Sequence, residues 1–252
     1  MICTVEHNSN HIQFDTAEGT SLAIPILFTE KYLSAYGVGA PTKKPYAVEG
    51  FTGSVHLGGS CNCDVIEMIP HCHTTHTECV GHVLSKPVFA YEALQENLFL
   101  SKLITITPDD FKVSAELLRA RVKLNGHKAL IIRTTPNTDA KKTAQYADKA
   151  PYMTKDAVEW CNQHGVEHLL VDFPSMDPIW DGGRLEAHRT FWNLTPEQKE
   201  IDSKTWVHKT ITELIYVPDL ISDGDYVLNL QVSNLQLDAS PSTPIIYPVR
   251  EV

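Results

Sequence analysis

Residues 114–134 read SAELLRARVKLNGHKALIIRT, and they decide the fold class. The first half has apolar residues every three or four positions, which is typical of an amphipathic helix, with Ser114 suited to the N-cap and Gly126 to the stop. The apolar run at residues 128–134 predicts a buried strand. The apolar stripe of the helix consists of Leu117, Leu118, Val122 and Leu124. A helix followed directly by a buried strand is typical of α/β architecture.

The same order of elements recurs downstream. Residues 154–164 predict a second helix that ends at Gly165, and residues 166–173 (VEHLLVDF) predict another buried strand. Cys161, on this second helix, is expected in the core. A chain of 252 residues is long enough for one substantial core. We therefore predict a single α/β domain over residues 1–252, with a mixed β-sheet or barrel-like β core flanked by helices.

Shorter segments on both sides of these units predict further strands, a loop and one more helical excursion. The strands are expected at residues 21–28, 52–57, 65–69, 103–106, 226–230, 231–237 and 245–249. Residues 36–46, rich in Gly and Pro, predict a loop, and the segment that contains residues 195–199 (TPEQK) predicts the helical excursion. The strands of the C-terminal tail favour sheet packing and contacts between subunits, so we expect a homo-oligomer, either a dimer or a tetramer.

Charge and composition argue against several classes of partner. Asp and Glu outnumber Lys and Arg by 31 to 21, and no basic patch is present that would bind a phosphate backbone, so we expect no nucleic-acid partner. No run of about eighteen apolar residues is present, so no membrane span is expected. The first ten residues lack the features of a secretory signal, which favours the cytoplasm, and the cysteines are expected to stay reduced there.

The richest chemistry lies in residues 71–82, which read HCHTTHTECVGH. Imidazoles, carboxylates and thiols bind transition metals or carry protons near neutral pH. In an extended segment, residues two apart share a face. The polar groups of one face are then Cys72, His76, Glu78 and His82. Either Cys72 is the first metal ligand, or a bulge near residues 74–75 brings His71 round from the opposite face, which also carries His73.

A metal site is favoured over chance composition because four histidines and an interleaved carboxylate fall within this short segment. Zinc and manganese both suit such nitrogen and oxygen ligands. The alternative is a closed structural zinc site. Its thiolates would come from Cys61, Cys63, Cys72 and Cys79, although their spacing does not form CxxC pairs. The carboxylate of Glu78 at the centre favours a catalytic metal.

Residues 75–82 resemble the signature of the metal-dependent cyclase family, which includes kynurenine formamidase-like hydrolases and is written His-x-Gly-Thr-His-x-Asp-x-Pro-x-His. The direct matches are Thr75, His76 and His82, and the substitutions are Glu78 for the Asp, Thr74 for the Gly and Val80 for the Pro. Cys72 stands at the position of the first His. Because Pro70-His71 precedes it, we identify His71 as the first ligand, displaced by one residue, with Cys72 and His73 as rivals. The resemblance implies a cyclase-like fold of the swivelling β/β/α type.

The resemblance extends to three later sites. Family members carry an Asp-x-x-Ser-x-Asp stretch, then a His on a helix, then a Glu. The corresponding residues are Asp172, Ser175 and Asp177, followed by His188 and then Glu213. By resemblance, His188 and Glu213 bind metal or handle protons. His208 is a rival candidate, and Asp177 either orients His188 or caps the next turn.

The resemblance also implies a chemistry, the hydrolysis of a C–N bond in a small amide, aryl formamide or lactam. The metal ligands would be His71, His76, Glu78, His188 and Glu213, and the catalytic residues His82 and His188. The cation would activate water, and His82 would carry the proton. An apolar substrate pocket would be lined by Phe51, Phe173, Trp180 and Trp192. The alternatives are a non-catalytic metal-binding protein of the same fold and a structural-zinc interaction module.

Overall fold

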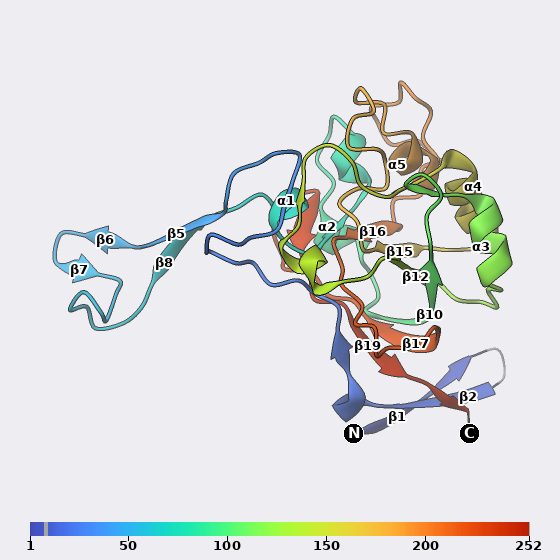
Figure 1. Cartoon of the computed structure of the whole chain (residues 1–252), viewed down its shortest axis with the longest axis horizontal. Coiled ribbons are helices and arrows are strands. Elements are labelled where there is room, and N and C mark those ends of the chain that lie inside the picture. Colours follow the sequence, from blue (N-terminus) through green and yellow to red (C-terminus); the bar gives the residue numbers. More distant parts are fainter. Residues whose placement is uncertain (8–9, 252) are drawn as a thin grey trace.

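Nine strands form one curled, mixed sheet through the centre of the molecule (Figure 1). The computed structural model describes residues 1–7 and 10–251. In sheet order the strands are β18 (Ala239–Pro241), β9 (His76–Glu78), β16 (Thr210–Glu213), β15 (His168–Val171), β12 (Ala129–Thr134), β10 (Leu98–Ile106), β17 (Gly224–Asn229), β19 (Ile245–Pro248) and β3 (Thr20–Ser21). The central strands β16, β15, β12 and β10 run parallel, and the outer strands pair antiparallel. The predicted mixed sheet is confirmed.

Both predicted helix–strand units are present. Helix α3 (Ala115–Arg121) leads into β12, and helix α4 (Lys155–Gln163) leads into β15. The Ser114 hydroxyl accepts a hydrogen bond from the Leu117 amide at 3.4 Å and so caps α3 as expected. Gly126 and Gly165 follow the two helices with φ angles of 71° and 75°, a left-handed conformation that glycine adopts without steric cost.

The parallel strands are buried on both faces. In β12, Leu130 and Ile132 pack into the cluster that contains α3, α4 and α5 (Glu186–Phe191), and Ala129 and Ile131 pack into a second cluster on the opposite face. All four side chains are fully buried. Burying a Leu or Ile side chain stabilises the fold by about 1.5–3 kcal/mol relative to leaving it exposed. Burial on both faces explains why this strand reads as a continuous apolar run.

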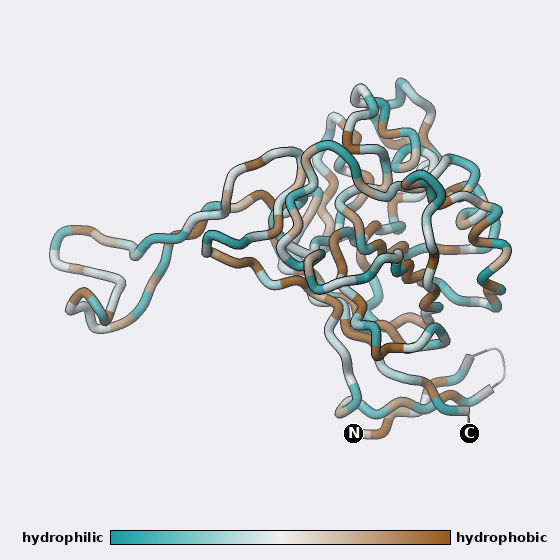
Figure 2. The backbone as a smooth tube through the Cα atoms, viewed as in Figure 1, coloured by the Kyte–Doolittle hydropathy of each residue, from teal (hydrophilic) through white to brown (hydrophobic). Residues whose placement is uncertain are grey.

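A long hairpin projects from the body of the molecule (Figure 1). Its stem pairs β5 (Thr42–Pro45) with β8 (Asp64–Glu67), and its tip carries β6 (Ala47–Val48) and β7 (Phe51–Thr52). All residues of the stem strands are exposed. Figure 2 shows hydrophobic residues interspersed with hydrophilic ones along this hairpin. We call residues 42–67 the arm.

The other elements are short and lie around the sheet. They are β1 (Ile2–His7), β2 (Asn10–Asp15) and β20 (Arg250–Glu251) in one small sheet, β4 (Ser34–Ala35) paired with β13 (Gln145–Tyr146), β11 (Lys112–Val113) paired with β14 (Tyr152–Met153), helices α1 (Pro70–His73) and α2 (Ala90–Ala93), and 3-10 helices η1 (Thr16–Glu18), η2 (Val80–Val83) and η3 (Asp139–Thr143). Within residues 1–7 and 10–251, no helix has the length and apolar character needed to cross a membrane.

Two predicted strands in the first half of the chain are largely wrong. Of residues 21–28, only Ser21 lies in a strand, and Ala23 adds an isolated bridge to Ile215. Pro25 explains the early end, because proline has no N–H to donate to a strand ladder. The strand expected at residues 52–57 ends at Thr52, and turns follow it.

Two predictions in the second half are also wrong. Residues 195–209 form turns instead of a helix, and the buried side chain of Arg189 donates a hydrogen bond at 2.9 Å to the Gln198 carbonyl. Residues 231–237 lie outside the named strands. The short strand β18 forms instead just after them, where the chain pairs with β9.

Candidate metal centre

Residues 70–83 do not form one extended run, so the predicted alternation of faces is wrong at both ends. Residues 70–73 form the single turn α1, residues 76–78 form β9, and residues 80–83 form η2. Pro70 occupies the start of α1, where its fixed φ and its missing N–H are compatible with a helix. The turn carries His71 round to the face of β9 from which the predicted alternation had excluded it.

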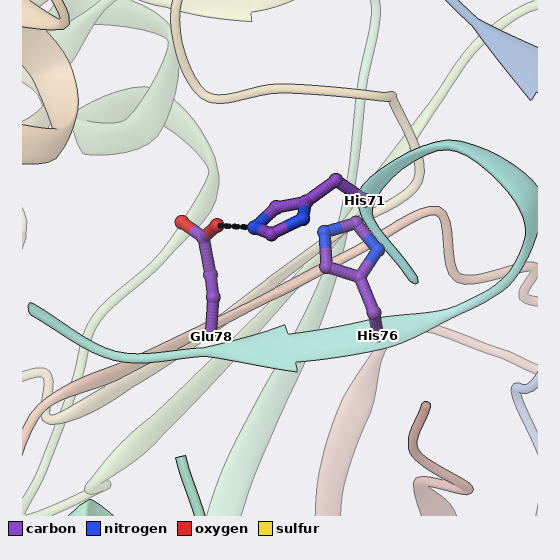
Figure 3. Close-up of side chains that lie close together, drawn as sticks. All are labelled: His71, His76 and Glu78. Atoms are coloured by element: carbon purple, nitrogen blue, oxygen red, sulfur yellow. Dashed lines mark ion pairs between the residues drawn. The ribbon is translucent and has the colours of Figure 1, made fainter. Parts of the chain in front are cut away.

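His71, His76 and Glu78 converge on one point (Figure 3). His76 and Glu78 project from the same face of β9 because they are two residues apart in a strand. His71 Nε2 lies 3.4 Å from Glu78 Oε2, and the rings of His71 and His76 are 5.1 Å apart between centroids. Of the three rival first ligands, the structure brings His71 to the cluster.

The other two rivals have different surroundings. His73 Nδ1 accepts a hydrogen bond from the Ile69 amide at 3.0 Å, and Nε2 donates one at 2.8 Å to the Gly39 carbonyl. Both ring nitrogens are therefore used to fix the loop before the arm. Burial raises the pKa of the Cys72 thiol to about 11, and the negative charge of Glu213 adds to the shift. A thiol with this pKa is a poor source of thiolate near neutral pH.

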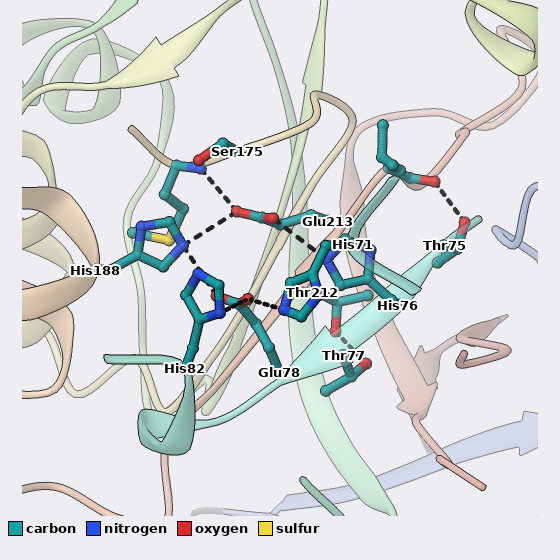
Figure 4. Close-up of polar contacts among 12 residues, drawn as sticks. His71, Thr75, His76, Thr77, Glu78, His82, Ser175, His188, Thr212 and Glu213 are labelled. Atoms are coloured by element: carbon teal, nitrogen blue, oxygen red, sulfur yellow. Dashed lines mark hydrogen bonds and ion pairs between the residues drawn. The ribbon is translucent and has the colours of Figure 1, made fainter. Parts of the chain in front are cut away.

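His188 and Glu213 reach the same centre from distant parts of the chain (Figure 4). Glu213 lies in β16 directly opposite His76, and its Oε2 atom is 3.4 Å from His76 Nε2. His188 lies in α5, and its Nε2 atom is 2.9 Å from Glu78 Oε1 and 3.5 Å from Glu213 Oε1. These distances place both residues beside the first motif, and their functions stay predictions.

Asp177 performs both of the functions that the sequence left open. Its Oδ2 atom accepts a hydrogen bond from His188 Nδ1 at 2.6 Å, and its Oδ1 atom accepts one from the Ala187 amide at 2.8 Å. The first bond orients the imidazole so that Nε2 faces the centre, and the second satisfies an amide in the first turn of α5. Ser175, two residues earlier, accepts a hydrogen bond from the Asp177 amide at 3.1 Å.

His82 joins the cluster by a different path from the one predicted. It lies in η2 and not in register with β9, yet its Nδ1 atom is 3.7 Å from Glu78 Oε2. The ring of His82 lies 4.7 Å from that of His71 and 5.5 Å from that of His188, measured between centroids. Its side chain is 26% exposed, whereas Glu78 is fully buried. His82 is thus partly exposed at the edge of the cluster, as is His71 at 24%.

Sequence reasoning missed two residues at this centre. Asp238, just before β18, places Oδ2 3.1 Å from His71 Nε2 and 3.0 Å from His82 Nδ1. Tyr36, with a left-handed φ of 57°, places its hydroxyl beside Ser175 and within electrostatic range of Glu213. No spacing pattern connects either residue with the motif. Of the two, only Tyr36 had a feature in the sequence that pointed to function: the Gly and Pro residues around it predicted a loop, and loops often carry functional residues.

Charges in the cluster reinforce one another. Burial would raise the pKa of Glu78, but the neighbouring imidazoles, above all the hydrogen-bonded His188, hold it well below its usual range. Burial would lower the pKa of His71, but the Asp238 and Glu78 carboxylates raise it to about 10. The pKa of His188 is likewise well above its usual value, because Glu78 and Asp177 outweigh the effect of burial. The centre therefore stabilises positive charge strongly.

The residues fit a divalent cation. Five buried polar atoms of the cluster have no hydrogen-bond partner within the described residues: His71 Nε2, His76 Nε2, Glu78 Oε1, Glu78 Oε2 and His188 Nε2. Leaving a buried polar group unsatisfied costs about 1–3 kcal/mol, so such a concentration needs an explanation. Imidazole nitrogens and carboxylate oxygens are ligands of Zn²⁺ and Mn²⁺. Pair distances of 2.9–3.5 Å agree with ligand atoms at about 2.0–2.2 Å from one ion.

Several other predicted site residues lie elsewhere. His208 is exposed and lines a different cavity beside His168, at the opposite end of β15 from Asp177. Phe51 is at the tip of the arm, where it packs on Tyr46. Phe173 and Trp192 are fully buried core residues, and Trp180 is 73% exposed. The predicted aromatic pocket is therefore not formed by these four residues within one chain.

The cysteines do not form the alternative structural zinc site. Cys61 and Cys63 are exposed on the arm, and Cys72 and Cys79 are buried in the body. Among residues 1–7 and 10–251, the groups of side chains arranged to hold a metal ion contain only His, Glu and Asp. Burial raises the pKa of the Cys79 thiol to about 12, which disfavours thiolate ligation.

Comparison with known proteins agrees with this geometry. The family model described as "Putative cyclase" matches residues 6–178, which include α1, β9, η2 and Asp177. The chain belongs to this cyclase family. The predicted family resemblance is thereby confirmed, although the matched range ends before His188 and Glu213.

Curated relatives carry the name kynurenine formamidase. The protein from Bacillus thuringiensis subsp. konkukian is 28% identical over 217 residues, covering 83% of this chain and 90% of the relative. The protein from Bacillus cereus (strain ATCC 10987) is 29% identical over 127 residues, and the match spans about half of each chain, 50% of this one and 52% of the relative.

Solved structures of cyclase-like proteins share the fold. A predicted metal-dependent hydrolase from Bacillus stearothermophilus superposes with a TM-score of 0.64 at 14% identity, covering 91% of this chain and 97% of the other. Isatin hydrolase A from Labrenzia aggregata gives a TM-score of 0.62 at 15% identity, covering 91% and 93%. These similarities confirm the predicted cyclase-like α/β fold.

Proposed function

We propose that this cyclase-family chain is a metal-dependent hydrolase that cleaves a C–N bond in a small amide, an aryl formamide or a lactam. The observation that carries the proposal is the set of unpaired nitrogen and oxygen atoms of His71, His76, Glu78 and His188 facing one another in a buried centre. Relatives named kynurenine formamidase and neighbours named isatin hydrolase support an amide or formamide substrate.

The proposed cation is Zn²⁺ or Mn²⁺. The residues that would hold it are His71, His76 and Glu78, together with His188 next to Glu78 and Glu213 next to His76. When bound, such an ion supplies Lewis acidity, which polarises a carbonyl and makes water a stronger acid. The ligand nitrogens are held ready for it: His188 Nδ1 donates to Asp177, and His76 Nδ1 lies 3.1 Å from the Thr74 carbonyl. In both residues Nε2 faces the centre.

His82 is the proposed proton carrier. Amide hydrolysis requires that a base take a proton from the attacking water and that an acid deliver one to the leaving nitrogen. His82 lies at the edge of the centre, partly open to solvent, and an imidazole can perform both transfers near neutral pH. His188 is the second catalytic residue of the proposal, since its Nε2 atom lies between Glu78 and Glu213 and stabilises negative charge there.

The deciding experiment combines elemental analysis of the purified protein with a substrate panel. The panel contains aryl formamides, including the formamide of kynurenine, simple amides, and lactams, including isatin. We expect about one equivalent or more of zinc or manganese and turnover of at least one C–N substrate, lost on chelation and restored by the metal. Protein that is folded, loaded with metal and inactive on the whole panel contradicts the proposal and supports a metal-binding protein without catalysis.

The structural-zinc alternative makes a different spectroscopic prediction. Thiolate ligands give Co²⁺-substituted protein an intense charge-transfer absorption, which nitrogen and oxygen ligands do not. We expect no such band, because the described donor groups contain no cysteine. A strong thiolate band that disappears on replacing Cys72 or Cys79 would favour the structural-zinc site.

Assembly and location complete the proposal. We propose a homo-oligomer, a dimer or a tetramer, in which the arm packs on a second copy of the chain. An isolated two-stranded hairpin is only marginally stable in water, yet the arm exposes Val65, Ile66 and Leu57. Contact with another copy would cover these side chains. The partner of the active site is proposed to be a small molecule, and a cytoplasmic location stays a prediction.

A further inference from the structure

Asp238 contacts two histidines of the centre, but in different ways. Its Oδ2 atom lies 3.0 Å from His82 Nδ1, with the geometry of a hydrogen bond. The same oxygen lies 3.1 Å from His71 Nε2, yet that nitrogen has no hydrogen bond. The Asp238 side chain is 32% exposed, so it stands at the rim of the buried cluster.

The backbone fixes Asp238 at this place. Its carbonyl accepts a hydrogen bond from the Cys79 amide at 3.0 Å, directly after β9. The next residues form β18, which pairs with β9 so that Ala239 is opposite Glu78 and Pro241 is opposite His76. The strand that carries the proposed ligands therefore also sets the position of Asp238, and the carboxylate needs no long flexible segment to reach His82.

Three histidines of the centre, His76, His82 and His188, share one arrangement. His188 and His76 each have Nδ1 within hydrogen-bond distance of an oxygen, of Asp177 and of the Thr74 carbonyl, and leave Nε2 facing the centre. His82 has Nδ1 on Asp238, which leaves Nε2 as its remaining nitrogen. Glu78 is the other carboxylate near His82 Nδ1, but it is farther away, at 3.7 Å. In the proposed function Glu78 also binds the cation, so Asp238 is the acceptor that stays available.

We infer that Asp238 is the positioning residue of His82. It accepts the Nδ1 proton, fixes the ring orientation and tautomer, and leaves Nε2 unprotonated to take a proton from water and return it to the leaving nitrogen. A carboxylate performs this service for a catalytic histidine in other hydrolases, where removing it leaves the ring in the wrong tautomer. The inference rests on the proposed function for its kinetic consequence, but the tautomer is independent of any substrate.

The test uses Asp238→Asn in the full-length protein loaded with Zn²⁺. The amide can turn either its oxygen or its nitrogen toward His82, so it no longer specifies one tautomer. We expect kcat to fall by about 10- to 100-fold while KM and metal content stay close to wild type. Asp238→Glu, which retains a carboxylate, is expected to recover part of the lost kcat.

Asp225→Asn is the matched control. Asp225 also faces a histidine, His127, with Oδ1 at 2.9 Å from Nε2, but Asp225 lies in β17 and His127 just before β12, outside the centre. The control removes a histidine-facing carboxylate of similar exposure and is expected to leave kcat unchanged. Thermal melts of both variants show whether the folded state is retained.

Long-range ¹H–¹⁵N NMR of the imidazoles supplies a readout that needs no substrate. We expect His82, assigned by comparison with His82→Ala, to carry its proton on Nδ1 in the wild type and to lose this single tautomer in Asp238→Asn. An Nε2-protonated wild type overturns the inference. So does an unchanged kcat in Asp238→Asn, or a loss of metal from it, which would make Asp238 a ligand. If the wild type shows this tautomer but hydrolyses nothing on the panel, the proposed function fails and the positioning contact stands.

Discussion

His76 and Glu213 face each other as directly opposed residues in the antiparallel pair of β9 and β16, with Nε2 and Oε2 3.4 Å apart. One strand comes from the first third of the chain and the other from near its end. The register of this pair brings the histidine-rich segment next to Glu213, which lies on a parallel strand of the core. If the register of the two strands shifted by one residue, one of these side chains would point to the opposite face of the sheet. The metal centre would then not form.

Replacing His76 tests the metal centre directly. His76→Ala removes one of the unpaired nitrogens, so we expect the bound zinc or manganese to fall well below one equivalent and activity to fall by at least about 100-fold, more than for loss of an outer partner. Elemental analysis and steady-state kinetics measure both. His56→Ala, on the exposed arm, is the control and is expected to retain metal and activity. Full metal occupancy in His76→Ala would contradict the assigned ligand.

Replacing His82 separates proton transfer from metal binding. His82→Ala is expected to keep the metal and to lose about 10²- to 10⁴-fold in kcat, the range for loss of a general acid or base. The comparison variant is His208→Ala, since His208 is exposed and lines a separate cavity beside His168. We expect it to behave as wild type. Turnover that survives in His82→Ala would remove this residue from the mechanism.

Asp177 is expected to act through His188. Asp177→Asn keeps the size of the side chain but weakens the 2.6 Å contact to His188 Nδ1, so we expect a loss of about 10- to 100-fold in metal affinity or in kcat. Competition with a chelator gives the affinity. Asp148→Asn, at an exposed position, controls for the change of charge. Equal metal affinity and equal kcat in Asp177→Asn and wild type would show that the contact only caps α5.

The metal-free protein is expected to lose stability as the pH rises. The pKa of His71 is raised to about 10 in the folded protein, against about 6.5 when unfolded. A raised pKa stabilises the folded state fully below pH 6.5, and this contribution is lost as the pH rises toward 10. Urea unfolding in the presence of a chelator, at several pH values, should show a steeper loss in wild type than in His71→Asn. With metal bound, the cation replaces the protons and the difference should disappear.

The arm is expected to control assembly. Ile66→Asp places a charge on the exposed stem of the hairpin, where we propose that a second copy packs, so the mutant should shift toward monomer. Sedimentation velocity at several protein concentrations measures the shift. Leu220→Asp is the control, because Leu220 is also an exposed aliphatic residue, at 83% against 54% for Ile66, but lies in the body of the chain. Wild-type protein that is monomeric at all concentrations would contradict the proposed oligomer.

The sequence by itself determined the elements that depend on neighbours along the chain. The 114–134 and 154–173 segments predicted their helices and strands because amphipathic spacing and capping are local properties. The motif at residues 75–82 likewise identified His76 and Glu78, since two residues of one strand must share a face. His188 and Glu213 came from the order of residues in a known family, not from local physics.

Only the tertiary structure decided how the centre closes. The turn of α1 brings His71, and not Cys72 or His73, to the centre. Side chains repeat every 3.6 residues in a helix but every two residues in a strand, so the pattern of an extended chain does not predict this. Asp238 reaches the centre because β18 pairs with β9. Tyr36 reaches it because His73 holds the loop that carries Tyr36. Strand pairing and loop closure depend on contacts between residues far apart in the chain. Local spacing carries no information about such contacts, so these residues became visible only in three dimensions.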